Sequence, residues 1–371
     1  MIPVSEPVVL QQDIDLVVDA LKRGEISGSF GAYITEFEKR FAEYCECKYG
    51  IATSNGTTAL HLAVLSAGIG PGDEVIVSTF TNIATVFAIV QAGATPVAAD
   101  SERDTWNMDV SLLPGLLTSR TKAILPVHIY GHPVDMEPLL NFAAQNHLLV
   151  IEDCAEAHGA LFKGRKVGGL GDIGCFSFYA NKVIVTGEGG MLTTNNEDFA
   201  RRARLLRNLA FTQPRFRHEE IGFNYRMTNY QAAMGVGQLS RIESIISEKR
   251  RVAALYSEGL AGISGLQLPV EKNYARNVYW MYGVKLNPEF NVSRDMLMTK
   301  LNETGIETRT FFCPMNLQPC FHRLGLFQDV SCPVSENLWQ NGLYLPSTYT
   351  LDKQSISFIT ETIGKIQRQG I

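Results

Sequence analysis

A single lysine, Lys182, stands among apolar and small residues in the stretch FSFYANKVIVTGEGGML, which covers residues 176–192. A buried ammonium without a partner is costly, so such a lysine usually shifts its pKa or takes part in chemistry. A neutral lysine amine forms a Schiff base with an aldehyde. The alternative is a lysine whose ammonium reaches water past its own aliphatic stem. The motif SFY-x-NK before Lys182 and TGEGG after it favour the chemical interpretation.

Three other segments carry residue types that would complement this lysine. TSNGTTALHL (53–62) is a polar turn that opens a helix, and the N–H groups of Gly56 and Thr57 would face an anion there, although it also fits an ordinary N-cap. Asp153 ends the run LLVIED, where its carboxylate would meet a cation or a protonated ring nitrogen, or cap a following helix. GFNYRMTN (222–229) is polar and aromatic and precedes a long helix, which it could simply cap.

Together the four segments supply what pyridoxal phosphate (PLP) requires of a protein. The cofactor needs an anion cradle for its phosphate, an acid that keeps its pyridinium nitrogen protonated, and a lysine for its aldehyde. We therefore expect Lys182 and Asp153 to be catalytic. Lys182 is isolated, in this interpretation, because its amine must be available for imine exchange and proton transfer.

Three further patterns have a weaker claim to chemistry. A G-x-G-x-x-G lies at 169–174, but it precedes a strand, whereas a dinucleotide fingerprint follows a strand and opens a helix. Cys154 and His158 have i,i+4 spacing, but no third group orients them, so we expect packing roles. Cys45 and Cys47 form a C-x-C pair without a second pair of matching spacing, so no metal site is expected.

Alternating strands and helices must position these residues. Strands are predicted by Val- and Ile-rich runs at 73–79, 95–100, 122–129 and 148–153, with helices between them at 61–69 and 136–147. Two more strands, at 173–179 and 189–195, would flank the lysine loop. This alternation predicts a mostly parallel sheet covered on both faces, with ligands at the carboxyl ends of its strands.

The pattern changes in the last third of the chain. Beyond a long amphipathic helix at roughly 229–261, we expect a strand at 278–286, a helix begun by Ser293, a strand at 307–312 and a last helix near 353–369. These elements predict a smaller α+β unit. We expect a large α/β domain at 1–245 and a small C-terminal domain at 246–371.

Composition places the chain among ordinary globular proteins. Its 371 residues are 45% hydrophobic and 19% charged, and the net charge of −5 gives no nucleic-acid footprint. The first residues carry acids and no basic segment, so they do not predict a signal peptide, and no uncharged apolar run could span a bilayer. Seven scattered cysteines predict reduced thiols and a cytoplasmic protein.

The motifs also occur in the order of a known family. They are NGTTALHLA, GPGDEVIV, TKAILPVHIYGHPVDM, VIEDCAEAHGA, FSFYANK, TGEGGM and GFNYRMTNYQAA. Over nearly its whole length the chain resembles the sugar aminotransferases of the DegT/DnrJ/EryC1/StrS group. The resemblance implies PLP fold type I, the aspartate aminotransferase-like fold. Within this group the chain most resembles the GDP-perosamine synthase branch. The enzymes of that branch aminate C4 of a nucleotide-linked 4-keto-6-deoxy sugar and take the amino group from glutamate.

The resemblance implies roles for the matching positions. Lys182 would be the Schiff-base lysine and Asp153 the partner of the pyridinium nitrogen. The other implied cofactor contacts are Gly56, Thr57 and Ser177 at the phosphate and Glu156 near the ring hydroxyl.

Other positions are implied to reach the substrate or a second subunit. Asn224 and Arg226 would reach the neighbouring subunit's cofactor or substrate, which implies a homodimer with shared active sites. The segment ETRTFFCPMN (307–316) offers Arg309 and two aromatic rings to a diphosphate or a sugar, and Asn316 stands where relatives often carry a histidine near the sugar.

Two departures from the family pattern bear on the substrate. In TFTNIAT (79–85), Asn82 stands where relatives place an aromatic residue that stacks on the cofactor ring, and whether Phe80 replaces it is left open. The segment EISGSFG (25–31) replaces a Trp-Ile-Ser of the perosamine branch.

Three alternatives to a C4 aminotransferase stay open. A 3-keto sugar aminotransferase would share every motif. A sugar dehydratase on the same scaffold replaces the lysine with histidine, against which Lys182 argues. A non-catalytic PLP-binding regulator normally adds a DNA-binding segment, which this sequence does not show. The nucleotide and the sugar stereochemistry are also left open.

Overall fold

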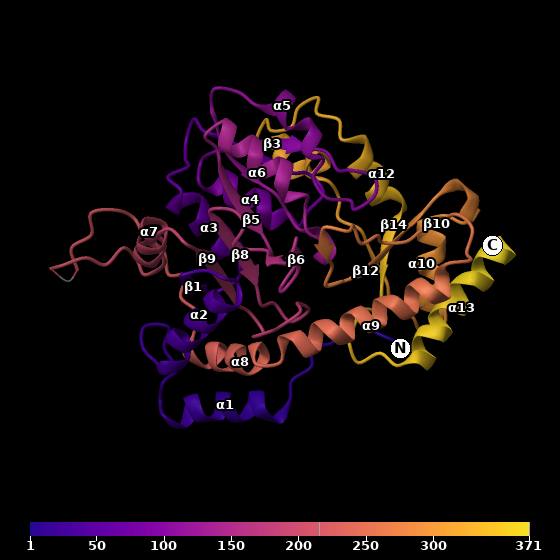
Figure 1. Ribbon diagram of the computed structural model, residues 1–371, viewed down its shortest axis with the longest axis horizontal. Coiled ribbons are helices and arrows are strands. Elements are labelled where there is room, and N and C mark those ends of the chain that lie inside the picture. The colour runs from indigo at the N-terminus through magenta and orange to yellow at the C-terminus, as the bar shows by residue number, and fades with distance from the viewer. Residues whose placement is uncertain (215, 371) are drawn as a thin grey trace.

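A computed structural model describes residues 1–214 and 216–370, and its largest sheet has seven strands in the order β1-β9-β8-β5-β4-β2-β3 (Figure 1). The strands from β8 to β3 run parallel to their neighbours, while β9 is antiparallel to both β1 and β8. The predicted mostly parallel sheet is therefore confirmed. The seven strands are β1 (Tyr49–Thr53), β2 (Glu74–Ser78), β3 (Thr95–Ala99), β4 (Thr121–Leu125), β5 (Leu149–Asp153), β8 (Ile173–Ser177) and β9 (Gly190–Thr194).

Both faces of this sheet are buried, which explains why its strands are continuous apolar runs. Successive residues of a strand point to opposite faces, and in β2 the side chains of Val75 and Val77 join one apolar cluster while Ile76 joins another. The covering helices are α2 (Ala32–Tyr44), α3 (Gly56–Ser66), α4 (Ile83–Gln91), α5 (Leu113–Leu116), α6 (Met136–Gln145), α7 (Glu197–Arg207) and α8 (Asn229–Leu239). Helix α1 (Gln11–Lys22) packs on the outer side of α8 (Figure 1).

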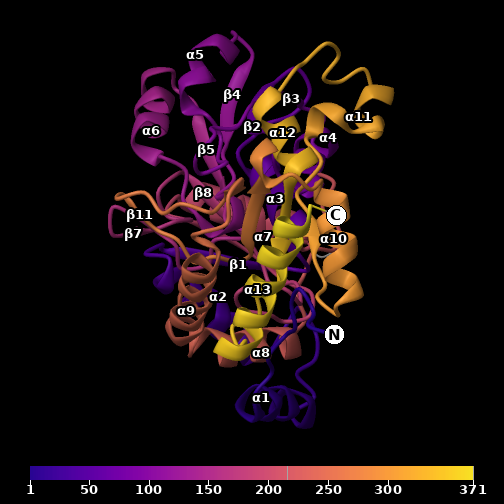
Figure 2. The same ribbon diagram turned by 90° about the vertical axis from the view of Figure 1, so that its right-hand side faces the viewer.

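A second unit follows, built on a four-stranded antiparallel sheet in the order β10-β12-β14-β13. The helices of this unit face the viewer in Figure 2. Its apolar core is formed mainly by side chains of that sheet and of its three longest helices. The elements are β10 (Leu266–Gln267), β12 (Tyr282–Leu286), β13 (Arg309–Thr310), β14 (Gly342–Leu345), α9 (Ile242–Leu260), α10 (Arg294–Glu303), α11 (Pro319–Arg323), α12 (Pro333–Asn341) and α13 (Lys353–Gln369). Short strands β6 (Leu161–Phe162), β7 (Arg165–Lys166) and β11 (Ala275–Arg276) form a third sheet.

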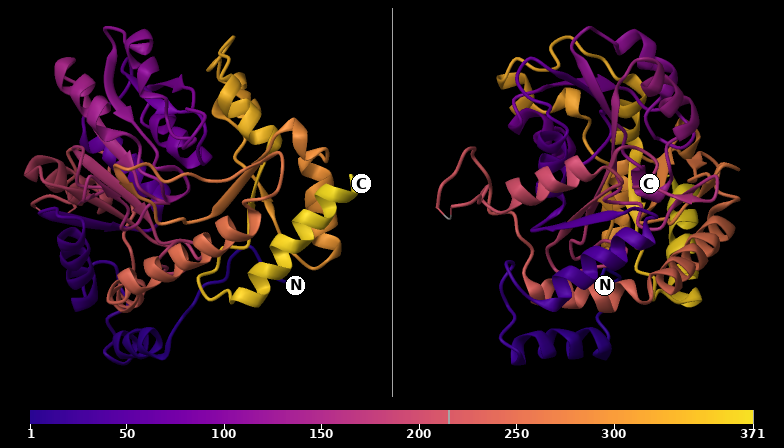
Figure 3. Two further views of the ribbon diagram at one scale, coloured as in Figure 1. Left: turned by 45° about the vertical axis from the view of Figure 1, so that its right-hand side comes forward. Right: turned by 60° about the vertical axis from the view of Figure 1, so that its left-hand side comes forward.

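Helix α9 leads from the first unit to the second and packs against α13 (Figure 3). The boundary expected between residues 245 and 246 would fall inside this helix, and it stays a prediction. Within residues 1–214 and 216–370, no helix combines the length and the apolar character that crossing a membrane requires.

The expectation of one long helix at roughly 229–261 is wrong, because α8 and α9 are separated by a turn at Ser240 and Arg241. The Ser240 hydroxyl donates to the Gly237 carbonyl at 2.6 Å, which bends the chain. The Arg241 guanidinium donates to the buried Asp13 carboxylate of α1 at 2.7 Å. Tertiary contacts thus overrule the helical periodicity at this point.

Candidate active site

The lysine loop joins β8 to β9, two antiparallel neighbours in the large sheet. The Phe178 N–H donates to the Gly189 carbonyl and the Thr186 N–H to the Phe178 carbonyl, both at 2.8 Å. Gly187 has φ +83°, a conformation that favours glycine, so the TGEGG turn closes the loop without strain. Lys182 is thereby held beside the carboxyl end of β8.

A cavity of about 400 Å³ opens at this edge of the sheet. It lies where β5 ends with Asp153 and β8 with Ser177, which is the usual ligand position in open α/β sheets. Seven of the residues predicted from the sequence line it, namely Gly56, Thr57, Asp153, Glu156, Ser177, Lys182 and Arg309.

The Asp153 carboxylate is fixed and buried on the cavity wall. One oxygen accepts the Ala155 N–H at 3.0 Å and the other the Thr85 hydroxyl at 2.8 Å. Burial raises the pKa of Asp153, while these hydrogen bonds and the charge of Lys182 oppose that rise. Residues 154–159 form turns and no helix, so Asp153 does not act as a helix cap. A cation placed against this carboxylate would be stabilised.

The Lys182 ammonium lies 3.9 Å from the centre of the Trp280 ring. Burial lowers the pKa of Lys182, and the carboxylates of Glu156 and Asp153 oppose that effect. Glu156 is 3% exposed, and its Oε2 accepts the Tyr130 N–H at 2.8 Å. Burial raises the pKa of Glu156, against the charge of Lys182. Lys182 and Glu156 thus line the same cavity, and the charge of each favours the charged form of the other.

The start of α3 provides an anion cradle in the same cavity. The Asn55 side chain caps this helix by accepting the Thr58 N–H at 2.9 Å, which leaves the first N–H groups of the helix, at Gly56 and Thr57, directed outward. A Cβ added to Gly56 would lie 2.7 Å from the Ser177 Cβ, so glycine is required for this close approach. A cradle, a buried carboxylate and a lysine amine around one cavity fit the three needs of PLP.

Three predicted residues lie outside the lining of this cavity. Asn224 is exposed and pairs through its main chain with Asn208. Arg226 donates to the Asn208 side chain at 2.5 Å. The Asn316 side chain is 2% exposed and bonds to Thr79, Val330 and Glu336, so its amide is engaged within its own surroundings.

Sequence reasoning missed most of the aromatic wall. Phe80 is 1% exposed and packs on the rings of Phe311 and Phe312, away from the cavity lining. Asn82 does line the cavity, where its side chain caps α4 by accepting the Ala84 N–H at 3.0 Å. The aromatic lining residues are Tyr179, Trp280, Phe312 and Tyr344. Phe312 is one of the two rings expected from ETRTFFCPMN (307–316), and the aromatic density of VYWMYG (278–283) could have pointed to Trp280.

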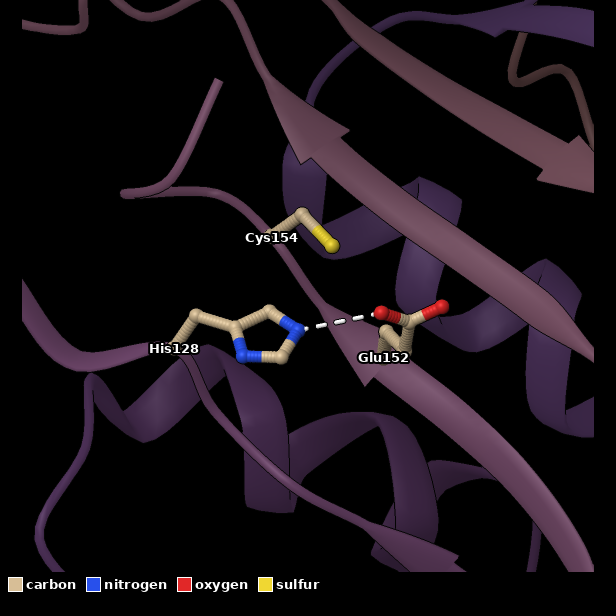
Figure 4. A group of neighbouring side chains, drawn as sticks. All are labelled: His128, Glu152 and Cys154. Carbon is tan, nitrogen blue, oxygen red and sulfur yellow. Dashed lines mark hydrogen bonds and ion pairs between the residues drawn. The ribbon is translucent and has the colours of Figure 1, made fainter. Parts of the chain in front are cut away.

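The glycine motif at 169–174 serves the chain's own Glu152. That carboxylate accepts the N–H groups of Gly168, Leu170 and Gly171 at 2.8–2.9 Å. It also pairs with His128 Nε2 at 3.1 Å (Figure 4). The N–H groups of this loop thus bind a carboxylate of the chain itself.

Cys154 lies beside this His128–Glu152 pair (Figure 4). Burial raises its thiol pKa well above the usual range, so the sulfur stays protonated. The His158 ring packs among Phe41, Phe176 and Phe178, and burial lowers its pKa to about 3. These contacts account for Cys154 and His158 as packing residues beneath the lysine loop.

Residues 9–364 match the model of the DegT/DnrJ/EryC1/StrS aminotransferase family. The chain belongs to that family. A GDP-perosamine synthase of Caulobacter vibrioides is 43% identical over 98% of both chains, and one of Escherichia coli O157:H7 is 41% identical over 98% of both. A Streptococcus pneumoniae chain solved in its PLP form has a TM-score of 0.93 at 26% identity, covering 100% of this chain and 99% of its own.

Family membership confirms the fold type, the cofactor and the reaction class predicted from the motifs. This DegT/DnrJ/EryC1/StrS member is a PLP-dependent aminotransferase of fold type I. The individual roles of Lys182, Asp153 and the other lining residues stay predictions, and the geometry above is what supports them.

Proposed function

We propose that this aminotransferase converts the ketone of a nucleotide-linked 4-keto-6-deoxyhexose to an amine, with glutamate as the amino donor. The observation that carries the proposal is the 43% identity to a GDP-perosamine synthase over 98% of both chains. The cavity supports it, because Arg309, Phe312 and Tyr344 line it together with Lys182. Arg309 offers a positive charge to a diphosphate, and the two rings offer flat apolar surfaces to a sugar. Amination at C4 also leaves the anomeric phosphate linkage intact.

The proposed roles follow from the positions of the side chains. Bound PLP supplies the electron sink that lets an amino group pass between two carbon centres. Asp153 would keep a proton on the ring nitrogen, and the start of α3 with Ser177 would hold the phosphate. Lys182 would hold the cofactor through its amine and carry protons to and from the substrate carbon. Glu156 would contact the cofactor from the cavity wall, and Arg309 would orient the anionic substrate.

The substrate assignment has a direct test. GDP-4-keto-6-deoxymannose with glutamate is expected to yield the 4-amino sugar, identified by mass spectrometry and proton NMR, and the Lys182→Ala variant is the negative control. If amine forms only from a 3-keto sugar or a UDP- or dTDP-linked 4-keto sugar, the enzyme is still a sugar aminotransferase but the perosamine assignment is wrong. Loss of a sugar hydroxyl group without nitrogen transfer would indicate a dehydratase. If none of these keto sugars is turned over, the protein is a regulator.

We also propose a homodimer with shared active sites. Helix α1 exposes an apolar stripe at Leu10, Ile14, Val18 and Leu21, between 37% and 52% exposed, on the side away from α8. Asn224 and Arg226 lie outside the cavity of their own chain, which suits residues that complete a partner's site. A cytoplasmic location is proposed as well, supported by seven free cysteines.

Mixing two inactive variants tests the shared site. In a hybrid of Lys182→Ala and Arg226→Ala chains, one site keeps both side chains, so random exchange should restore about a quarter of the parent activity. The matched control mixes Lys182→Ala with Arg309→Ala, which should restore nothing because both residues line one cavity of one chain. Mass spectrometry confirms that hybrids have formed. If the hybrids of the first mixture are inactive, Arg226 acts in the active site of its own subunit and the shared-site proposal is wrong.

A further inference from the structure

Trp280 connects the second unit of the fold with the lysine loop. It precedes β12 and is 3% exposed, and its ring centre lies 3.9 Å from the Lys182 ammonium. Its Nε1–H donates to the carbonyl of Asn181, the residue before the lysine, at 2.7 Å. One side chain therefore contacts both the ammonium and the main chain that carries it.

The main chain of Trp280 is fixed from two sides. Its N–H donates to the Tyr130 carbonyl at 2.9 Å. Its carbonyl accepts the Lys249 ammonium of α9, also at 2.9 Å, and the same ammonium donates to the Ser347 carbonyl at 2.9 Å. These two carbonyls come from segments that adjoin β12 and β14, so Lys249 ties the ends of two strands to the connecting helix.

Lys249 is an unusual choice for a purely structural tie. Its side chain is 5% exposed, and within residues 1–214 and 216–370 it makes no ion pair. Burial lowers its pKa to about 7. Burying an unpaired ammonium is costly, whereas an apolar residue would fill the same volume without that cost. The gain from Lys249 is thus the placement of the Trp280 and Ser347 carbonyls.

We propose that Trp280 is a positioning residue for Lys182, and that Lys249 holds Trp280 in place. This inference rests on the proposed role of Lys182. The ring face attracts the protonated amine and so favours the ammonium form of Lys182, as do Asp153 and Glu156 from the cavity side. The Nε1 donation fixes the loop that sets where the amine lies relative to the cavity.

Capture of PLP by the full-length chain, stripped of cofactor, measures the placement of the amine without any sugar substrate. Its rate is followed by visible absorbance across a range of pH, and hydrogen exchange of the amides at 181–183 reports the order of the loop. Trp280→Phe keeps an aromatic face and loses the Nε1 donation. We expect capture to slow about fivefold, the effect of one lost hydrogen bond, and loop exchange to quicken.

Trp280→Leu removes the aromatic face as well. Capture requires the neutral amine, and the ring favours the charged one, so the pH of half-maximal capture should lie about half a unit lower in the leucine variant than in the phenylalanine variant. Comparing these two variants cancels most of the change in packing volume, because both residues are apolar and smaller than tryptophan.

Lys249→Met should reproduce the slower capture and faster loop exchange of Trp280→Phe. Its pH of half-maximal capture should equal that of the parent, because the Trp280 ring is intact. The controls are Trp339→Phe and Lys300→Met, whose side chains do not line the cavity, and both should behave as the parent. Thermal melting establishes whether each variant is folded. If Trp280→Leu does not fold, Trp280→Phe and Lys249→Met still test the proposal.

Two results would overturn the inference, and they are distinguishable. Capture and loop exchange within about twofold of the parent in both Trp280 variants would remove Trp280 from the positioning of Lys182 and leave the rest of the proposed function standing. A parent chain that captures no PLP through Lys182 would remove the role of that lysine, and with it the inference.

Discussion

Replacing Lys182 with alanine is expected to give a folded protein whose turnover falls by at least about 10³-fold, because the variant loses both the covalent attachment point and the proton carrier. The rest of the cavity is retained in this variant. Asp153 keeps its bonds to Thr85 and Ala155, and the start of α3 keeps its Asn55 cap. We therefore expect the cofactor phosphate to be bound still, more weakly than in the parent.

Three measurements check this result together. They are turnover of a nucleotide-linked keto sugar with glutamate, cofactor content after gel filtration, and the melting temperature. Lys163→Ala is a suitable control, because that lysine is exposed and forms its ion pair with Glu137 at the surface. Turnover of Lys182→Ala near that of the parent would show that another group performs the chemistry.

The residues that could be predicted from the sequence are those with local signals. Lys182 stands in an apolar segment before a glycine turn, Asp153 ends an apolar run, and Gly56 opens a helix after a capping asparagine. Each signal is contained within about ten residues. Parallel strands then bring their carboxyl ends to one edge, so the predicted sheet already implied that these segments meet.

The residues that could not be predicted depend on contacts distant in sequence. Trp280 and Tyr344 reach the cavity from the second unit, and apart from the aromatic run around Trp280 nothing near them in the chain indicates that they line it. Asn316 donates its amide to the Glu336 carboxylate and the Val330 carbonyl, contacts that its own segment does not indicate, and its place near the sugar stays a prediction. The break between α8 and α9 likewise depends on Asp13, more than two hundred residues away.

Asp153→Asn is expected to preserve the cavity and lower turnover by about 10²- to 10⁴-fold. An asparagine offers one acceptor and one donor where the carboxylate offers two acceptors. Its oxygen must face the Ala155 N–H, which can only donate, so its NH₂ group faces the Thr85 hydroxyl. That hydroxyl can rotate to accept and donate instead to Thr81, whose oxygen lies 2.8 Å away. The hydrogen bonds to Ala155 and Thr85 are thus retained, and the negative charge is lost.

The loss of charge is what should lower the rate, because a neutral amide does not keep the ring nitrogen protonated. Thr85→Val separates charge from orientation: it keeps the carboxylate and removes one hydrogen bond, so its turnover should fall by only about tenfold. Asp172→Asn is the control, since that carboxylate also accepts a main-chain N–H, from Val150 at 2.8 Å, but precedes β8 at the far end of the strand. Measured with saturating glutamate and cofactor, turnover of Asp153→Asn equal to that of Asp172→Asn would exclude a role for the Asp153 charge, whereas the order parent, Thr85→Val, Asp153→Asn would establish it.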